Sequence, residues 1–129
     1  MKVFISSRKF KICDYSESHS QLLLRSYGSE TCSNLDVIFF DVHYLNILYQ
    51  MNGVEITENN TMKIGDSSVD EYLAYSTSSL FTICTEGREY YIAASFYRVF
   101  ENELEIGESS LGVLEYIGRE KEIFSNRED

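Results

Sequence analysis

The sequence predicts a mainly β fold with one or two short helices, arranged as an antiparallel sandwich, a barrel or an α+β sheet. Short runs rich in β-branched and aromatic residues recur along the chain, and polar, turn-forming residues separate them. None of the 129 residues is proline, so every peptide bond keeps the N–H that sheet pairing needs. The pattern leaves the choice among the three arrangements open.

The first half of the chain predicts an early hairpin and a buried strand. Residues 9–15 alternate polar and apolar side chains, and a polar turn separates them from a second extended run, residues 21–27. Residues 35–42 contain four consecutive apolar side chains, so we expect a central strand that is buried on both faces. Residues 43–51 fit a strand or a short helix, and Asn52-Gly53 favours a hairpin turn directly after them.

The second half predicts one helix and a second hairpin. An aspartate before residues 67–75 is a good N-cap for a short helix. Residues 80–85 and 89–100 form the clearest hairpin pattern in the chain, across a turn that contains glycine. Residues 104–106 add an extended piece, and residues 112–117 fit either a strand or the start of a terminal helix.

The chain is expected to form a single domain over residues 1–129. Its length is usual for one domain, and it contains no low-complexity tract, internal repeat or linker. No apolar run approaches the roughly 20 residues that a membrane span needs, and the N-terminal apolar stretch is too short for a signal peptide. A cytoplasmic location is the simplest expectation.

Candidate catalytic and metal-binding residues are few, so the sequence does not predict an enzyme. His19 lies in a polar turn beside serines, without the spacing of a known nucleophile motif. His43 could share a strand face with Asp41, but no third metal ligand is near in sequence. Cysteine is present three times, without C-x-x-C spacing. We therefore expect no cofactor, metal or disulfide framework.

The charge is strongly negative and unevenly distributed. Residues 1–64 hold 7 acidic and 6 basic side chains, whereas residues 65–129 hold 14 and 5, within a total net charge of −10. Nucleic acid needs a cationic surface, so the charge argues against it as a direct partner. A basic protein partner fits better, although acidity that serves only solubility is the alternative.

The most informative segment is the carboxylate-rich stretch 101–108. On a strand, three of its glutamates would line one face about 7 Å apart while Leu104 and Ile106 turn inward. Such a row predicts an electrostatic docking edge with nearby tyrosines as aromatic anchors. The alternative is a solvated edge strand whose charges prevent aggregation. The predicted partner-binding residues are Glu101, Glu103, Glu105, Glu108, Tyr97 and Tyr116.

In its overall character, the chain resembles the immunity proteins that protect bacteria from toxins, including those of contact-dependent growth inhibition systems. The resemblance lies in the small size, the acidity, the absence of proline and the carboxylate-rich segment. It implies a tight complex with a basic toxin domain, often a nuclease, whose active site is covered. The alternative function is a structural or accessory domain that self-associates through a sheet edge.

Overall fold

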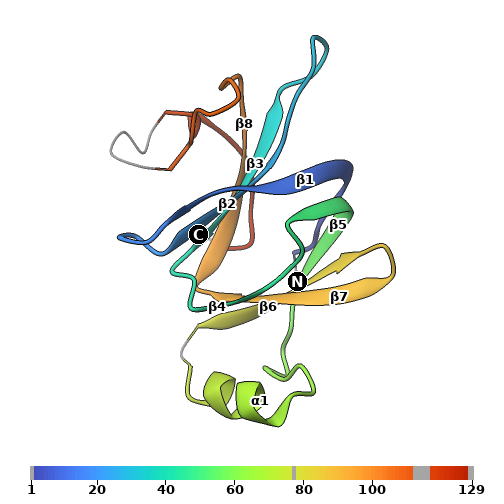
Figure 1. The fold of residues 1–129 in the computed structure, drawn as a ribbon, viewed down its shortest axis with the longest axis vertical. Coiled ribbons are helices and arrows are strands. Elements are labelled where there is room, and N and C mark those ends of the chain that lie inside the picture. Colours follow the sequence, from blue (N-terminus) through green and yellow to red (C-terminus); the bar gives the residue numbers. More distant parts are fainter. Residues whose placement is uncertain (1, 77, 112–116, 128–129) are drawn as a thin grey trace.

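The computed structural model describes residues 2–76, 78–111 and 117–127 (Figure 1). Those residues form mainly antiparallel β sheet with a single short helix, which confirms the predicted fold class. That helix is not long and apolar enough to cross a membrane. The elements in chain order are β1 (Phe4–Ser16), β2 (Gln21–Ser26), β3 (Asn34–Phe40), β4 (Tyr44–Asn46), β5 (Gln50–Glu58), α1 (Ser67–Ala74), β6 (Ser79–Thr85), β7 (Arg88–Ala94), β8 (Phe96–Asn102) and β9 (Lys121–Ser125).

The strands make one sheet in the order β4-β7-β6-β5-β1-β2-β3-β8-β9. The long strand β1 pairs with β5 over its first part and with β2 over its last part. Phe39 of β3 and Phe81 of β6 are far apart in this order, yet their ring centroids are 5.8 Å apart. The sheet therefore bends across β1, and its two halves face each other as the layers of a sandwich.

The main core fills the space between the two layers. Phe39, Phe81 and Tyr97 are at most 1% exposed, and they come from strands on both sides of the bend. The Tyr97 ring centroid is 5.1 Å from that of Phe39, 5.2 Å from that of Phe81 and 5.7 Å from that of Phe124. Tyr97 thus joins the two layers at the centre of an aromatic cluster.

The burial of Tyr97 predicts a loss of stability at alkaline pH. Burial raises the pKa of the Tyr97 hydroxyl, because the low-dielectric core disfavours the phenolate. The buried, neutral Tyr97 contributes fully to the free energy of unfolding below pH about 10, where tyrosine is also neutral in the unfolded chain. This contribution falls as the pH rises further. Urea titrations between pH 9 and pH 11 are expected to show that the free energy of unfolding falls less steeply with pH in Tyr97→Phe than in the unmodified chain. An identical slope would contradict this account.

Each layer has an outer face that a non-strand segment partly covers. Leu73 of α1 packs in one cluster with Leu80 and Ala93 on the outer face of β6 and β7. On the other layer, Leu111 joins a cluster with Ile38 on the outer face of β2, β3 and β8. Figure 1 shows α1 and the segment that follows β8 at opposite ends of the molecule.

Most of the predicted elements are present. The early hairpin is β1 with β2, and β3 is an interior strand between β2 and β8 in which all but two residues are buried. Asp66 caps α1 by accepting hydrogen bonds from the backbone N–H groups of Ser68 and Val69. The second hairpin is β6 with β7, joined by Glu86 and Gly87, which both have positive φ.

The prediction of a hairpin turn at Asn52-Gly53 is wrong. Both residues lie inside β5, where Ser6 pairs with Val54 and Lys9 pairs with Asn52. Two residues of β1 therefore face Gly53 alone, which forms a β-bulge, and Gly53 adopts a φ of +79°. A glycine after asparagine meets the backbone demand of a bulge as well as that of a turn.

Two further expectations differ from the structure, and a third lies largely outside the described residues. The long arm 89–100 breaks at Ser95, where the chain crosses from β7 in one layer to β8 in the other. Residues 104–106 form no strand. Most of the segment 112–117 lies outside the described residues, and the following strand β9 pairs with β8.

Candidate functional site

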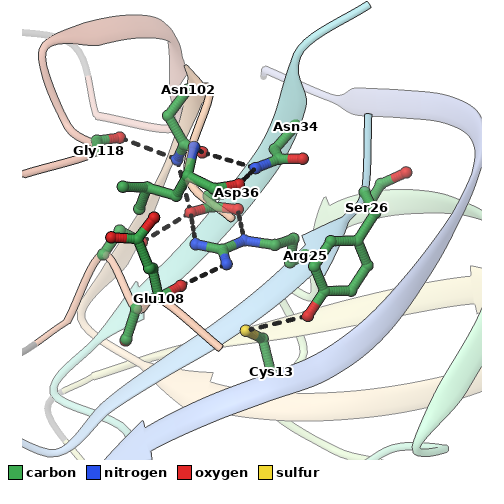
Figure 2. Close-up of polar contacts among 12 residues, drawn as sticks. Cys13, Arg25, Ser26, Asn34, Asp36, Asn102, Glu108 and Gly118 are labelled. Carbon is green, nitrogen blue, oxygen red and sulfur yellow. Dashed lines mark hydrogen bonds and ion pairs between the residues drawn. The ribbon is translucent and has the colours of Figure 1, made fainter. Parts of the chain in front are cut away.

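The segment after β8, residues 103–111, is here named the acidic loop, and it is fastened to the sheet by a buried ion pair. Arg25 of β2 and Asp36 of β3 are both fully buried and lie opposite each other on paired strands. The Arg25 Nε donates to Asp36 Oδ1 at 2.7 Å, and its Nη2 donates to Oδ2 at 2.8 Å. The third guanidinium nitrogen, Nη1, donates to the backbone carbonyl of Glu108. Figure 2 shows Arg25 between Asp36 and Glu108.

Further polar side chains complete this cluster around the Asp36 carboxylate. The Asn102 amide donates to Asp36 Oδ2 at 2.8 Å, and the Ser110 hydroxyl donates to the same oxygen at 2.7 Å. Asn34 donates to the Asn102 side-chain oxygen at 2.9 Å and to the Leu104 carbonyl at 2.7 Å. All five of these side chains are buried. We call them the Arg25 network: Arg25, Asn34, Asp36, Asn102 and Ser110.

The electrostatics of the Arg25 network favour its charged state. Burial by itself lowers the pKa of the Arg25 guanidinium, but the hydrogen bonds and negative charge of Asp36 outweigh that effect and raise the pKa. No buried side-chain nitrogen or oxygen in the described part of the chain lacks a hydrogen-bond partner. A buried ion pair is stable only when its remaining donors and acceptors are satisfied in this way.

The tip of the acidic loop is a compact turn that displays an apolar side chain between two carboxylates. The Glu108 N–H donates to the Glu105 carbonyl at 3.0 Å, and the Glu105 N–H donates to Glu108 Oε1 at 2.8 Å. Gly107 adopts a φ of +93°, which the turn requires. Ile106 is 85% exposed. At the base of the loop, exposed Glu103 accepts a hydrogen bond from Ser33.

The predicted row of three carboxylates on one strand face is wrong. Glu101 belongs to β8, where it is half-buried and forms an ion pair with Lys121 at 3.4 Å. β8 is also not an edge strand, because β9 pairs along it. The strand ends at Asn102, whose side chain turns into the Arg25 network, so Glu103 and Glu105 follow in the loop. Ile106 points to solvent, contrary to the inward position predicted for it.

Of the two tyrosines predicted as anchors, the structure describes only Tyr97. Tyr97 lies in the main core at 1% exposure, so its assignment as a surface anchor is wrong. Tyr116 lies outside the described residues. The structure therefore brings together Glu103, Glu105 and Glu108 of the predicted set, beside the unpredicted Ile106.

The Arg25 network was not predicted from the sequence. A signal was present, because Arg25 and Asp36 are opposite charges inside the two most apolar runs of the first half of the chain. A charge at a position that strand alternation would bury is rare unless it is paired. The remaining members, Asn34, Asn102 and Ser110, have no pattern that distinguishes them from ordinary polar residues.

A cavity of about 440 Å³ lies beside α1 and includes His43. The Tyr72 hydroxyl donates to the His43 carbonyl at 3.1 Å and lies 2.9 Å from His43 Nδ1. Because that hydroxyl has one hydrogen, Nδ1 is the donor in the second contact. His43 Nε2 lies 3.1 Å from the Ser76 hydroxyl. These contacts fasten Tyr72 of α1 and Ser76, which follows the helix, to the connection between β3 and β4, which is a structural use of His43.

Two other reactive side chains, those of His19 and Cys32, lie in surface turns. His19 Nδ1 is 3.1 Å from the Ser18 hydroxyl in the turn between β1 and β2. Cys32 is exposed, and a hydrogen bond from Ser29 lowers the pKa of its thiol. Within residues 2–76, 78–111 and 117–127, no group of three or more His, Cys, Asp and Glu side chains is arranged to hold a metal ion.

Comparisons of the chain with protein-family models, curated proteins and solved structures find no match.

Proposed function

We propose that this chain is a binding protein that docks a basic protein surface through its acidic loop. The observation that carries the proposal is the link from the fully buried Arg25–Asp36 pair to the Glu108 carbonyl. A solvated loop that only connects two strands needs no such buried anchor. Functional loops, by contrast, are commonly held by a rigid scaffold.

The composition of the acidic loop supports a cationic partner. Residues 103–111 contain three carboxylates and no basic residue. Ile106, which lies between them, offers apolar area for a desolvated contact. Carboxylates raise the association rate of a cationic surface, and a fixed loop conformation lowers the entropy lost on binding. The acidic loop therefore combines long-range attraction with a preorganised contact.

The sequence resemblance implies a more specific function, that of an immunity protein that covers the active site of a bacterial toxin domain. In that case the carboxylates would steer the toxin into place, and the loop would block access to its substrate. The competing proposal is that the chain self-associates through a sheet edge. Light scattering across a concentration series distinguishes it from the proposal of a monomer that binds a basic partner. A mass that stays at 14.9 kDa supports a monomer that awaits a partner.

The test compares two triple variants in binding to a basic protein domain encoded beside this chain. E103Q/E105Q/E108Q removes three charges from the acidic loop, and glutamine keeps the hydrogen-bond acceptors that Ser33 and the Glu105 N–H use. The matched control E55Q/E86Q/E89Q removes three exposed charges near β5, β6 and β7.

The loop variant is expected to associate about tenfold more slowly at low salt, because steering depends on the local potential. The difference should shrink in 0.5 M salt, where exposed charges are screened. Equal association rates for the loop variant and the control variant would rule out the acidic loop as the docking site.

A further inference from the structure

We propose that the cavity between Tyr27 and the acidic loop receives an arginine side chain of the partner. This inference rests on the proposed function and names the group that the docking surface recognises. The cavity measures about 450 Å³ and is lined by Tyr27, Gly28, Asn34, Leu104, Glu105 and Ile106. Its lining combines an aromatic ring, two branched aliphatic side chains and one exposed carboxylate.

These chemical groups match the parts of an arginine side chain. Leu104 and Ile106 offer apolar surface to the methylene stem, and the Tyr27 ring offers a π surface to the planar guanidinium. The Glu105 carboxylate can accept two parallel N–H bonds, which the guanidinium fork supplies and an ammonium group does not. The lining therefore favours arginine over lysine.

The structure already contains one contact of this kind. The Arg25 guanidinium carbon lies 5.7 Å from the centroid of the Tyr27 ring, so this ring accepts a cation from the protein interior. The Arg25 charge is compensated by Asp36 at 2.7 Å, which limits its repulsion of a second guanidinium. Tyr27 remains 38% exposed and therefore presents ring surface to the outside as well.

Basic side chains near Tyr27 set the direction from which an arginine can approach. Arg8, Lys9 and Lys11 line a separate cavity that also contacts Tyr27. The Arg8 guanidinium is committed to backbone carbonyls, including those of Tyr27 and Ser33. A guanidinium is thus repelled from the β1 side of Tyr27 and attracted on the side of the acidic loop.

The wall of the cavity is held by contacts within the chain. A Cβ on Gly28 would lie 2.3 Å from the Cys32 carbonyl oxygen, so the two ends of the 28–34 connection are in tight backbone contact. The Gly28 N–H also donates to Asn34 Oδ1 at 2.7 Å, and Asn34 holds the Leu104 carbonyl. The two chain segments that line the cavity are therefore joined, and binding needs little rearrangement.

The test titrates the ¹⁵N-labelled full chain with N-acetyl-arginine-N-methylamide and follows amide shifts by NMR. The lysine analogue and the citrulline analogue are the comparison probes, since citrulline keeps the shape of arginine without its charge. Arginine is expected to shift the amides of Gly28, Leu104, Glu105 and Ile106, with an affinity about threefold or more above that of lysine. Citrulline is expected to cause no saturable shift.

Two variants of the chain complete the experiment. E105Q is expected to weaken arginine binding about threefold or more, while E89Q on β7 leaves it unchanged. Thermal melting of each variant confirms that it is folded. Shifts centred elsewhere, equal binding of citrulline, or an unchanged E105Q affinity would each overturn the assignment of this cavity.

The outcome is separable from that of the docking proposal. If E103Q/E105Q/E108Q slows association with the basic domain but arginine does not bind the cavity, the loop docks a cationic surface without this receptor and the inference is wrong. If arginine binds here and the triple variant associates normally, the cavity assignment stands and the docking proposal is wrong.

Discussion

Replacing Asp36 with asparagine is expected to lower the free energy of unfolding by about 3–5 kcal/mol, because the fully buried Arg25 guanidinium would lose its countercharge. Asparagine has nearly the volume of aspartate, so the loss reflects charge and hydrogen bonding rather than a cavity. Its amide group would also face donors from Asn102 and Ser110, which need an acceptor. Urea unfolding followed by tyrosine fluorescence measures the change.

A surface ion pair provides the control for Asp36→Asn. Arg98 and Glu122 are joined at 2.7 Å but are 25% and 38% exposed, so Glu122→Gln is expected to cost less than about 1 kcal/mol. Hydrogen exchange adds a local readout. The amides of the acidic loop should exchange faster in Asp36→Asn and stay unchanged in Glu122→Gln. Equal unfolding energies for the two variants would show that the buried pair does not stabilise the fold.

Replacing Phe39 with alanine is expected to lower the free energy of unfolding by about 3–5 kcal/mol, since it removes a fully buried ring from between the two layers. The Phe39 ring contacts those of Phe81 and Tyr97, which belong to strands on both sides of the bend in the sheet. The resulting cavity would lie where β6 of one layer meets β3 and β8 of the other.

The neighbouring residue supplies a matched control for Phe39→Ala. Phe40 has the same side chain on the opposite face of β3, where it is half-buried and stacks on Phe96 with centroids 4.6 Å apart. Phe40→Ala is expected to cost about half as much or less, because less of its surface is removed from water. A larger loss at Phe40 than at Phe39 would contradict the position of the core.

The local elements were largely predictable because their causes are local. The two hairpins, the buried strand β3 and the capped helix each follow from alternation, turn residues or an N-cap within a short window. Asn52-Gly53 shows the limit of such reasoning, because a bulge and a turn place the same demand on glycine. Which of the two forms depends on β1, more than 40 positions earlier in the chain.

The candidate site was predictable in composition but not in geometry. The sequence predicts a carboxylate-rich segment over residues 101–108, and the alternation of its glutamates indicates a strand. The chain leaves the sheet instead, because Asn102 binds Asp36, a residue 66 positions away. A contact between residues so distant in sequence leaves no periodic pattern, and the burial of Tyr97 depends on the bend of the whole sheet for the same reason.

The anchors of the acidic loop bind main-chain carbonyls, and this separates what the loop recognises from what holds it. Arg25 binds the carbonyl of Glu108, and Asn34 binds that of Leu104. Every residue type supplies a carbonyl, so exchange of the exposed side chains at positions 103, 105, 106 and 108 removes the side-chain contacts of Glu103 and Glu108 but leaves the bonds to the carbonyls in place. The exposed side chains of the loop can therefore vary while its backbone anchors stay the same. A library randomised at these four positions should retain the fold while sampling partners of different charge and shape.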